Sequence, residues 1–246
     1  MTIYDLHAHT TYSDGQASVE YLISRAAELG YRTGVSDHLF CDGNNTLADI
    51  GRYLDGVGGR GIPVGGEVNI GEEFRLPDSL AKKFDYFIAS VHAVYPADGP
   101  LPFGRYFAMR CGFRKSWEGY DRSRAEEYLE IALRQVSDHL ARYKTDILGH
   151  CCVMPFYDDL DYNSSVILNW EREIVSLCVK HGVAMEISGM WHEPYERLLR
   201  LAKSSGVKFS FGSDCHTIEG VCDLAYPLEM AERLGLSEDD LFIPRY

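Results

Sequence analysis

The segment Asp5-Leu6-His7-Ala8-His9 closes a short run of β-type residues and places two imidazoles at the end of that run. Six further runs of this kind follow along the chain, and each carries an imidazole or a carboxylate at or near its carboxyl end. Most are apolar and bounded by glycine, which is typical of strands buried on both faces of a parallel sheet. The seven expected strands are residues 3–7, 32–38, 62–69, 84–92, 146–150, 183–188 and 207–214.

Amphipathic helical segments lie between these runs. The first is expected to begin after Ser18 and to end at Gly30, because serine is a frequent N-cap and glycine terminates helices. The alternation of strand and helix predicts an α/β fold, either a β/α barrel or a doubly wound sheet. No glycine-rich nucleotide-binding motif follows any strand, which removes the usual signatures of the open sheet. The other expected helices are residues 47–57, 78–83, 124–143, 165–181, 194–204 and 227–234.

The length of 246 residues fits a single domain over the whole chain, a barrel of about seven β/α units. The chain carries 24 Lys and Arg against 37 Asp and Glu, a net charge of −13. This acidity argues against binding to long nucleic acid or to an anionic membrane, since both need a positive protein surface. The N-terminus does not resemble a signal peptide, and no apolar stretch reaches the length of a membrane span. Seven cysteines form no disulfide framework, so we expect reduced thiols and a cytoplasmic protein.

The polar residues at the strand ends indicate a metal centre. In β/α barrels the carboxyl ends of the strands form the active-site face, where these side chains would meet. Neutral imidazole combined with carboxylate is the ligand set of zinc, iron or manganese. So many ligands exceed the needs of one ion, and they predict two or three metals with Glu67 as a bridge. The strand-end residues are His7, His9, Asp37, His38, Glu67, His92, His150, Glu186, Asp214 and His216.

Several of these polar residues admit two interpretations. Asp37 is either a carboxylate that orients a histidine ligand or a turn-forming residue, and Glu186 is either a structural or supporting residue or a direct ligand. His192, in the loop after the sixth run, either contacts substrate or is solvated. His139 lies within a helical segment and is expected to be solvated, whereas His181 precedes Gly182 at a helix end and is expected to act as a cap.

The motifs HAHTTYSDG (7–15), SDH (36–38), GGE (65–67), SVH (90–92), ILGH (147–150) and GSDCH (212–216), taken in order, resemble the polymerase and histidinol phosphatase (PHP) family of metal-dependent phosphoesterases. The resemblance extends from Asp5 to His216 and implies a distorted (β/α)7 TIM-like barrel with three metals at the strand carboxyl ends. Within the family the chain looks most like the histidinol-phosphate phosphatases. It departs from them after His150, where HCCVMPFYDD lacks a basic residue.

The resemblance also implies how the metals would be shared. It assigns one metal to His7, His9, Glu67 and Asp214, a second to Glu67, His92 and His150, and a third to Asp14, His38 and His216. The implied reaction is hydrolysis of a phosphomonoester, such as L-histidinol phosphate, by attack of a metal-bridging hydroxide. Asp214, Glu67 and His216 would be the catalytic residues, and Asp214 would orient the nucleophile or accept its proton.

Residues 95–124 form a long basic and aromatic insertion. Six basic residues against Asp98, Glu118 and Asp121 give this segment a charge of +3. One interpretation is a lid whose cations grip a phosphate group, and the other is a solvated surface excursion around a small aromatic core. The residues predicted to bind substrate are Arg105, Arg110, Arg114, Lys115 and His192.

Three classes of function remain open from the sequence. The first is a phosphatase acting on a small anionic phosphorylated metabolite. The second is a nucleotide phosphatase or nuclease-type phosphoesterase on the same metals. The third is a non-catalytic metal-binding regulatory module, which would be more credible if ligand positions were missing.

Overall fold

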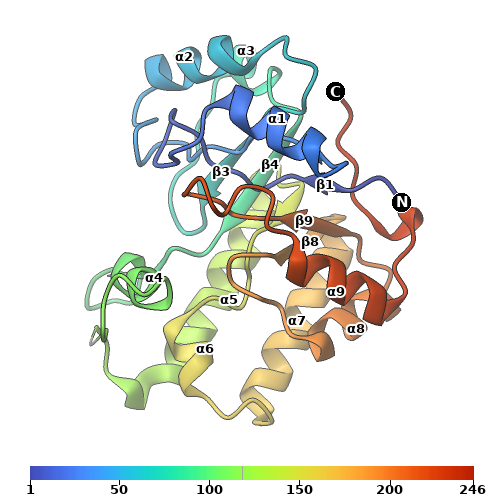
Figure 1. Ribbon diagram of the computed structural model, residues 1–246. Coiled ribbons are helices and arrows are strands. Elements are labelled where there is room, and N and C mark those ends of the chain that lie inside the picture. Colours follow the sequence, from blue (N-terminus) through green and yellow to red (C-terminus); the bar gives the residue numbers. More distant parts are fainter. Residues whose placement is uncertain (118) are drawn as a thin grey trace.

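Figure 1 shows the computed structural model of the chain, which describes residues 1–117 and 119–246. Glu118, which the sequence places in the basic insertion, lies outside the described residues. Five parallel strands form the main sheet in the order β3-β4-β7-β8-β9, and β1 pairs with β2 in parallel beside it. These strands are β1 (Tyr4–Asp5), β2 (Arg32–Thr33), β3 (Gly65–Asn69), β4 (Tyr86–Ser90), β7 (Ile147–Leu148), β8 (Ala184–Ser188) and β9 (Phe209–Gly212).

Backbone contacts connect the two-stranded pair to both edges of the main sheet. The amide of Leu6 donates to Phe211 O at 2.9 Å, which links β1 to β9. Parallel bridges join Val35 to Val64 and His38 to Glu67, which link the segment after β2 to β3. The chain is therefore an α/β protein with a parallel central sheet, as the strand and helix pattern predicts.

Each expected helix is present, with small shifts at the ends. Local signals position them: Ser18 accepts a hydrogen bond from the amide of Tyr21 at the start of α1, and Gly182 takes a left-handed conformation (φ 67°) at the end of α7. Those helices are α1 (Val19–Glu28), α2 (Leu47–Val57), α3 (Asp78–Ala81), α5 (Ala125–Arg142), α7 (Ser165–His181), α8 (Glu196–Ser204) and α9 (Ala225–Leu234).

The structure adds short elements that the pattern did not predict. The insertion contains α4 (Gly104–Arg110), which stands apart from the other helices in Figure 1. A small antiparallel pair, β5 (Ala93–Val94) and β6 (Leu101–Pro102), precedes it. The remaining elements are α6 (Pro155–Asp159) and the 3-10 helices η1 (Arg122–Arg124) and η2 (Glu238–Asp240). Helix α4 has no side-chain hydrogen bond at its N-cap, so the usual start signal was missing.

Tyr86 explains why glycine lies at two positions in the strands. Its hydroxyl donates to Leu6 O at 2.7 Å and to Val35 O at 3.0 Å, which fixes its ring among the strands. A Cβ atom at Gly34 or Gly65 would lie within 2.5 Å of this side chain. The strands can therefore pack around the tyrosine only because these residues lack side chains.

Two further observations concern the environment of the chain. Among the described residues, no helix combines the length and the apolar character needed to cross a membrane. All seven cysteines are free thiols.

Candidate metal centre

The nine predicted ligands converge at the carboxyl ends of the parallel strands. Glu67 lies within β3, and the other eight come from the segments that follow β1, β2, β4, β7 and β9. Most are buried, whereas the side chains of His92, His216 and Asp14 are 19%, 28% and 40% exposed and face the open side. The nine are His7, His9, Asp14, His38, Glu67, His92, His150, Asp214 and His216.

Glu67 lies at the middle of the cluster. Its Oε2 atom is 3.4 Å from His7 Nε2, 3.5 Å from His9 Nε2 and 3.0 Å from His38 Nδ1. The side chain is 1% exposed. One carboxylate oxygen of Glu67 therefore faces three imidazoles.

The other oxygen of Glu67 faces a second pair of imidazoles. Its Oε1 atom lies 3.4 Å from His92 Nε2 and 3.4 Å from His150 Nε2, and these two nitrogens are 3.4 Å apart. His92 Nδ1 is 2.7 Å from Asn69 Oδ1, so the amide oxygen holds the ring with Nε2 turned toward Glu67. This geometry suits a carboxylate that bridges two ligand groups.

The two carboxylate oxygens of Asp214, like those of Glu67, face different partners. Its Oδ1 atom is 3.1 Å from His9 Nε2 and 3.4 Å from His7 Nε2, whereas its Oδ2 atom accepts a hydrogen bond from Trp191 Nε1 at 2.6 Å. The residue has a positive φ of 51°, a conformation that side-chain-bearing residues rarely adopt.

Asp14 closes the cluster on its open side. Its Oδ2 atom is 3.3 Å from His216 Nε2, and its Oδ1 atom is 3.8 Å from both His9 Nδ1 and His38 Nε2. Ligand atoms of these four residues all lie within 4.8 Å of one another. Asp14 therefore lies where the resemblance places it.

The donor atoms fit divalent metals. Both carboxylate oxygens of Glu67 and the facing nitrogens of His7 and His38 are buried without a hydrogen-bond partner among the described residues. Such groups are costly to bury unless something satisfies them, and coordination would do so. Other groups within 4.8 Å are His7, His9 and Asp214; His38, Glu67 and His92; and His38, Cys41 and Asp42.

Charges within the cluster act on the imidazoles in opposite directions. Burial alone would lower the pKa of His7 and His38, but the carboxylates of Glu186 and Glu67 raise these pKa values well above 6.5, so a metal would displace protons from both rings. Burial alone would raise the pKa of Glu67, but the surrounding imidazoles, His7 first among them, hold it well below its usual value. Burial and the neighbouring His216 and His38 lower the pKa of His9 to about 3. Glu67 is therefore ionised and His9 neutral at pH 7, as metal ligation requires.

Glu186 supports the cluster from behind. Its Oε1 atom accepts a hydrogen bond from His7 Nδ1 at 2.7 Å, and its Oε2 atom accepts from the amide of His150 at 2.6 Å. This pairing leaves His7 Nε2 to face Glu67 and Asp214. Of the two interpretations from the sequence, the geometry matches that of a supporting residue.

Asp37 bonds the loop after β1 rather than a histidine ring. It accepts hydrogen bonds from the amide of Thr10 at 2.7 Å and from the hydroxyl of Ser13 at 2.6 Å. These bonds shape the loop that carries Asp14, which is the turn-forming interpretation. Asn69 and Trp191 are the partners that sequence reasoning missed, and the location of Trp191 beside His192 in a loop on the active face was the available signal.

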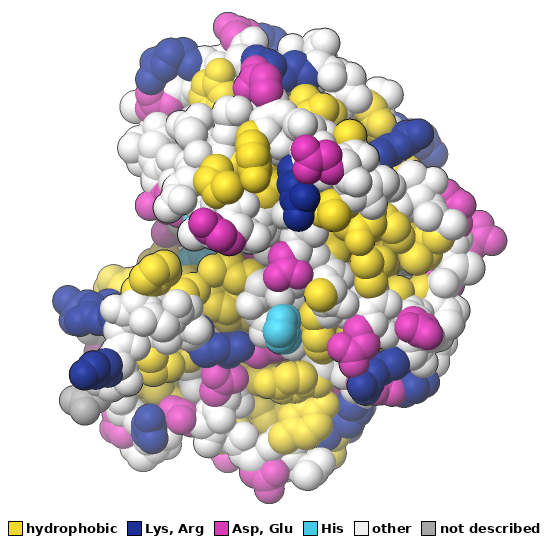
Figure 2. Space-filling view, in the orientation of Figure 1, with side chains coloured by type: hydrophobic (Ala, Val, Ile, Leu, Met, Phe, Trp, Pro, Cys, Tyr) yellow, Lys and Arg dark blue, Asp and Glu magenta, His cyan; other side chains and the backbone are white. Residues whose placement is uncertain are grey.

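A cavity of about 780 Å³ opens over the cluster. Figure 2 shows this side of the molecule hollowed between α4 and the upper part of the chain, with hydrophobic side chains along the α4 side. Apolar residues that include Phe107, Phe113 and Trp191 line it, together with the carboxylates of Asp42 and Glu72. No lysine or arginine among the described residues lines this cavity.

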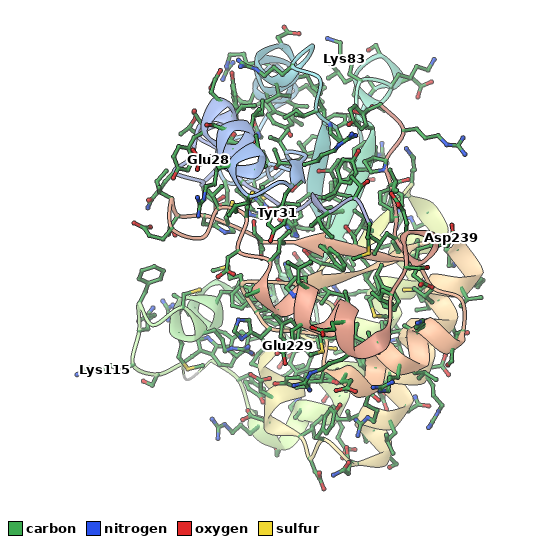
Figure 3. All side chains as sticks on the ribbon, turned by 45° about the vertical axis from the view of Figure 1, so that its right-hand side comes forward. Glu28, Tyr31, Lys83, Lys115, Glu229 and Asp239 are labelled. Atoms are coloured by element: carbon green, nitrogen blue, oxygen red, sulfur yellow. The ribbon has the colours of Figure 1, made fainter. Side chains whose placement is uncertain are left out.

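The residues predicted to bind substrate lie around the cavity at different distances. Arg110 and His192 line an adjoining cavity of about 510 Å³, and His192 stacks on Tyr226 with ring centroids 5.2 Å apart. The exposed side chains of the other three line neither cavity, and Lys115 points away from the protein at the tip of the insertion (Figure 3). Those three are Arg105, Arg114 and Lys115.

The sequence pattern of the PHP domain family matches residues 5–190. This chain belongs to the PHP family of metal-dependent phosphoesterases. At the level of sequence, no curated protein matches the chain.

Two solved structures have the fold of this PHP protein. One is a candidate histidinol phosphatase of Listeria monocytogenes, with a TM-score of 0.70 and 16% identity over 89% of this chain and 97% of the other. The second is histidinol phosphate phosphatase of Lactococcus lactis subsp. lactis in complex with zinc, L-histidinol and phosphate. It has a TM-score of 0.63 and 17% identity over 96% of this chain and 95% of the other.

Proposed function

We propose that this PHP protein is a phosphomonoesterase that acts on a small phosphorylated metabolite such as L-histidinol phosphate. The observation that carries the proposal is the position of Glu67, whose two buried oxygens face imidazoles on both sides without hydrogen-bond partners among the described residues. A site built in this way suits two or three divalent ions, and zinc, iron and manganese all favour this donor set.

The metals, when bound, would hold the phosphate group and lower the pKa of a coordinated water. The residues of the chain supply the rest of the chemistry. Asp214 lies between the imidazoles of His7 and His9, where it can orient the attacking group or accept its proton. His216 and Asp14, at the open side, are placed to contact the phosphate or the leaving alcohol. This arrangement supports catalytic roles for Asp214, Glu67 and His216.

The cavity favours a substrate with a cationic and partly apolar alcohol portion. Its walls are largely apolar, and they carry the carboxylates of Asp42 and Glu72. An amine or imidazolium group on the substrate would find a counter-charge there. L-histidinol phosphate has both groups, and the Lactococcus lactis enzyme was solved with L-histidinol and phosphate.

The proposal includes three further predictions. The parallel strands form a closed, distorted barrel of seven units in one domain with an insertion at residues 95–124, as the bonds between β1 and β9 and between the segment after β2 and β3 suggest. The exposed basic residues of this insertion, Arg105, Arg114 and Lys115, assist substrate binding together with His192. The protein acts in the cytoplasm.

The decisive experiment combines metal analysis with a panel of phosphomonoesters that includes histidinol phosphate. The purified wild-type protein is expected to contain zinc, iron or manganese and to hydrolyse at least one ester, and Glu67→Ala is expected to lose both properties. Glu130→Gln, an exposed carboxylate on α5, serves as the control. A wild-type protein with neither bound metal nor turnover would exclude the proposed function.

The preference for a cationic substrate has its own test. Glu72→Gln is expected to raise KM for histidinol phosphate by about two- to five-fold, the worth of an exposed ion pair. It should leave KM for phenyl phosphate, which has no cation, unchanged. An equal effect on both esters would contradict the assigned role of Glu72.

A further inference from the structure

Trp191 is the one indole that contacts the cluster directly among the described residues. Its Nε1 atom donates to Asp214 Oδ2 at 2.6 Å, and the residue is buried with 7% exposure. The hydrogen bond occupies one oxygen of Asp214 and leaves Oδ1 turned toward His7 and His9. An indole has a single donor and no acceptor, so it can pair with the carboxylate in one orientation only.

Asp214 needs such support because its backbone is strained. Its φ of 51° lies in the left-handed region, which is unfavourable for a residue with a side chain. Its amide donates to His7 O at 2.7 Å, and this bond holds the main chain. The bond from Trp191 holds the side chain, so both parts of the residue are fixed.

Trp191 lies in a loop after β8 that backbone hydrogen bonds hold in place. The amide of Ser188 donates to Glu193 O at 2.8 Å, and the amide of Gly189 donates to Gly212 O at 2.7 Å, which ties the loop to β9. The ring of Phe107 from α4 packs against the indole with centroids 5.3 Å apart. The indole therefore has contacts on the sheet side and on the side of the insertion.

Arg110 of α4 makes further contacts that hold this loop in place. Its guanidinium donates to Trp191 O at 3.3 Å, to Glu193 Oε1 at 3.3 Å and to Asp158 Oδ2 at 3.0 Å. Its Cζ atom also lies 5.8 Å from the centroid of the Trp191 ring. Glu193 is fully buried, so the arginine supplies the counter-charge that this carboxylate needs. Arg110 is thus engaged within the protein rather than extended toward solvent.

We propose that Trp191 is a positioning residue that fixes Asp214 for metal binding and catalysis, and that Arg110 of the insertion holds Trp191 in place. The inference rests on the proposed metal-dependent function and deepens it. In this inference Arg110 of the basic insertion does not bind phosphate. It holds the loop that carries Trp191, and Trp191 in turn holds the candidate metal ligand Asp214.

The first test is Trp191→Phe, which keeps a ring and removes the N–H donor. Loss of a group that supports a metal ligand costs about 10- to 100-fold in affinity or activity. We expect Trp191→Phe to weaken Mn²⁺ and Zn²⁺ binding to the metal-stripped protein by about ten-fold, and to lower kcat similarly with KM nearly unchanged. Trp170→Phe is the matched control, because that buried indole has no hydrogen-bond partner among the described residues.

Arg110→Met distinguishes positioning from phosphate binding, and it is combined with Glu193→Gln so that no buried charge is left unpaired. A positioning role predicts weaker metal binding and a lower kcat. A phosphate-gripping role predicts a higher KM with unchanged metal affinity, and that result would overturn the role assigned to Arg110.

The outcomes separate this inference from the proposed function. Metal affinity and kcat of Trp191→Phe equal to those of Trp170→Phe would overturn the inference while the wild type remained an active metalloenzyme. If the wild type binds no metal and hydrolyses nothing, the proposed function fails. The free energies of unfolding of Trp191→Phe, Asp214→Ala and the double variant then decide whether the two side chains are coupled, and strictly additive effects would exclude the pairing.

Discussion

Glu186 accepts hydrogen bonds from the ring of His7 and from the amide of His150, and both bonds require an acceptor. In Glu186→Gln one of the two donors would face the NH2 group, so one bond is lost. We expect metal affinity to fall by about 10- to 100-fold, as measured by titration of the metal-stripped protein. Glu173→Gln, an exposed carboxylate on α7, should leave it unchanged. Unaltered affinity in Glu186→Gln would show that the orientation of His7 does not depend on this pair.

His139 corrects an expectation from the sequence. It was expected to be solvated, but it is 2% exposed on the inner face of α5, with neither ring nitrogen hydrogen-bonded among the described residues. The helical pattern did not show which face would be covered, because α7 and α6 pack against α5 only in the folded chain. Burial, with Arg142 nearby, lowers the pKa of His139 from 6.5 to about 4.

This shift predicts a pH dependence of stability. Below pH 6.5 the unfolded chain protonates His139, whereas the folded protein resists protonation until about pH 4, so stability is lost as pH falls through this window. The loss is on the order of 3 kcal/mol. His139→Leu should be more stable than the wild type at pH 7 by about 1 kcal/mol. The difference should widen toward pH 4 in urea unfolding, and a constant difference would contradict the prediction.

At the scale of elements, Arg197 joins α8 to α7. Its guanidinium donates to both oxygens of Glu171 at 2.8 Å, and the Glu171 side chain is only 3% exposed. Arg197→Met leaves a buried carboxylate without its partner and should lower the free energy of unfolding by about 3–5 kcal/mol.

A matched control lies on the same helix. Arg200 pairs with Glu196 at the surface, with 57% of the arginine side chain exposed, so Arg200→Met should cost less than about 1 kcal/mol. Urea unfolding of both variants checks the comparison. Similar decreases in the free energy of unfolding would mean that burial does not determine how strongly these ion pairs stabilise the protein.

Elements with strong local signals were predictable. The predicted ranges of α2 and α7 match the structure because Thr46 and Ser164 cap their first turns and the apolar residues recur at helical spacing. Helix α4 was missed because its seven residues begin without a capping side chain. The strands are shorter than the runs that predicted them, and in several runs a residue beyond the end of the strand, such as His92 or His150, supplies a candidate ligand.

At the scale of the whole molecule, the metal centre gathers side chains from β3 and from the segments that follow five other strands, so metal binding should stabilise the entire fold. A ligand at 100 times its Kd adds about 2.7 kcal/mol to the free energy of unfolding. For a chain of this size, removal of metal with a chelator should therefore lower Tm by about 5–10 °C. Glu67→Ala is the control, because its Tm should not respond to the chelator. Equal Tm values of the wild type with and without chelator would contradict a shared metal centre.

The alternation of strands and helices and the identity of the strand-end residues can both be predicted from the amino-acid sequence. Both are local properties: strand periodicity, capping residues and glycine positions act within a few residues of one another. The order of the parallel strands then brings the ends of the runs to one face, which is why the cluster around Glu67 could be expected before its geometry was known.

Which atoms of these residues come into contact depends on the packing of the folded chain. The bond from Trp191 to Asp214, the pairing of Arg110 with Glu193, and the burial of His139 all join residues whose spacing in the chain carries no periodic signal. Such contacts depend on how loops and helices pack over the sheet, and a few ångströms decide whether a cation faces a cavity or a carboxylate. The sequence shows how many arginines the insertion contains. Only the packing shows that Arg110 pairs with Glu193 and that the cavity over the metal centre is lined by apolar and acidic residues.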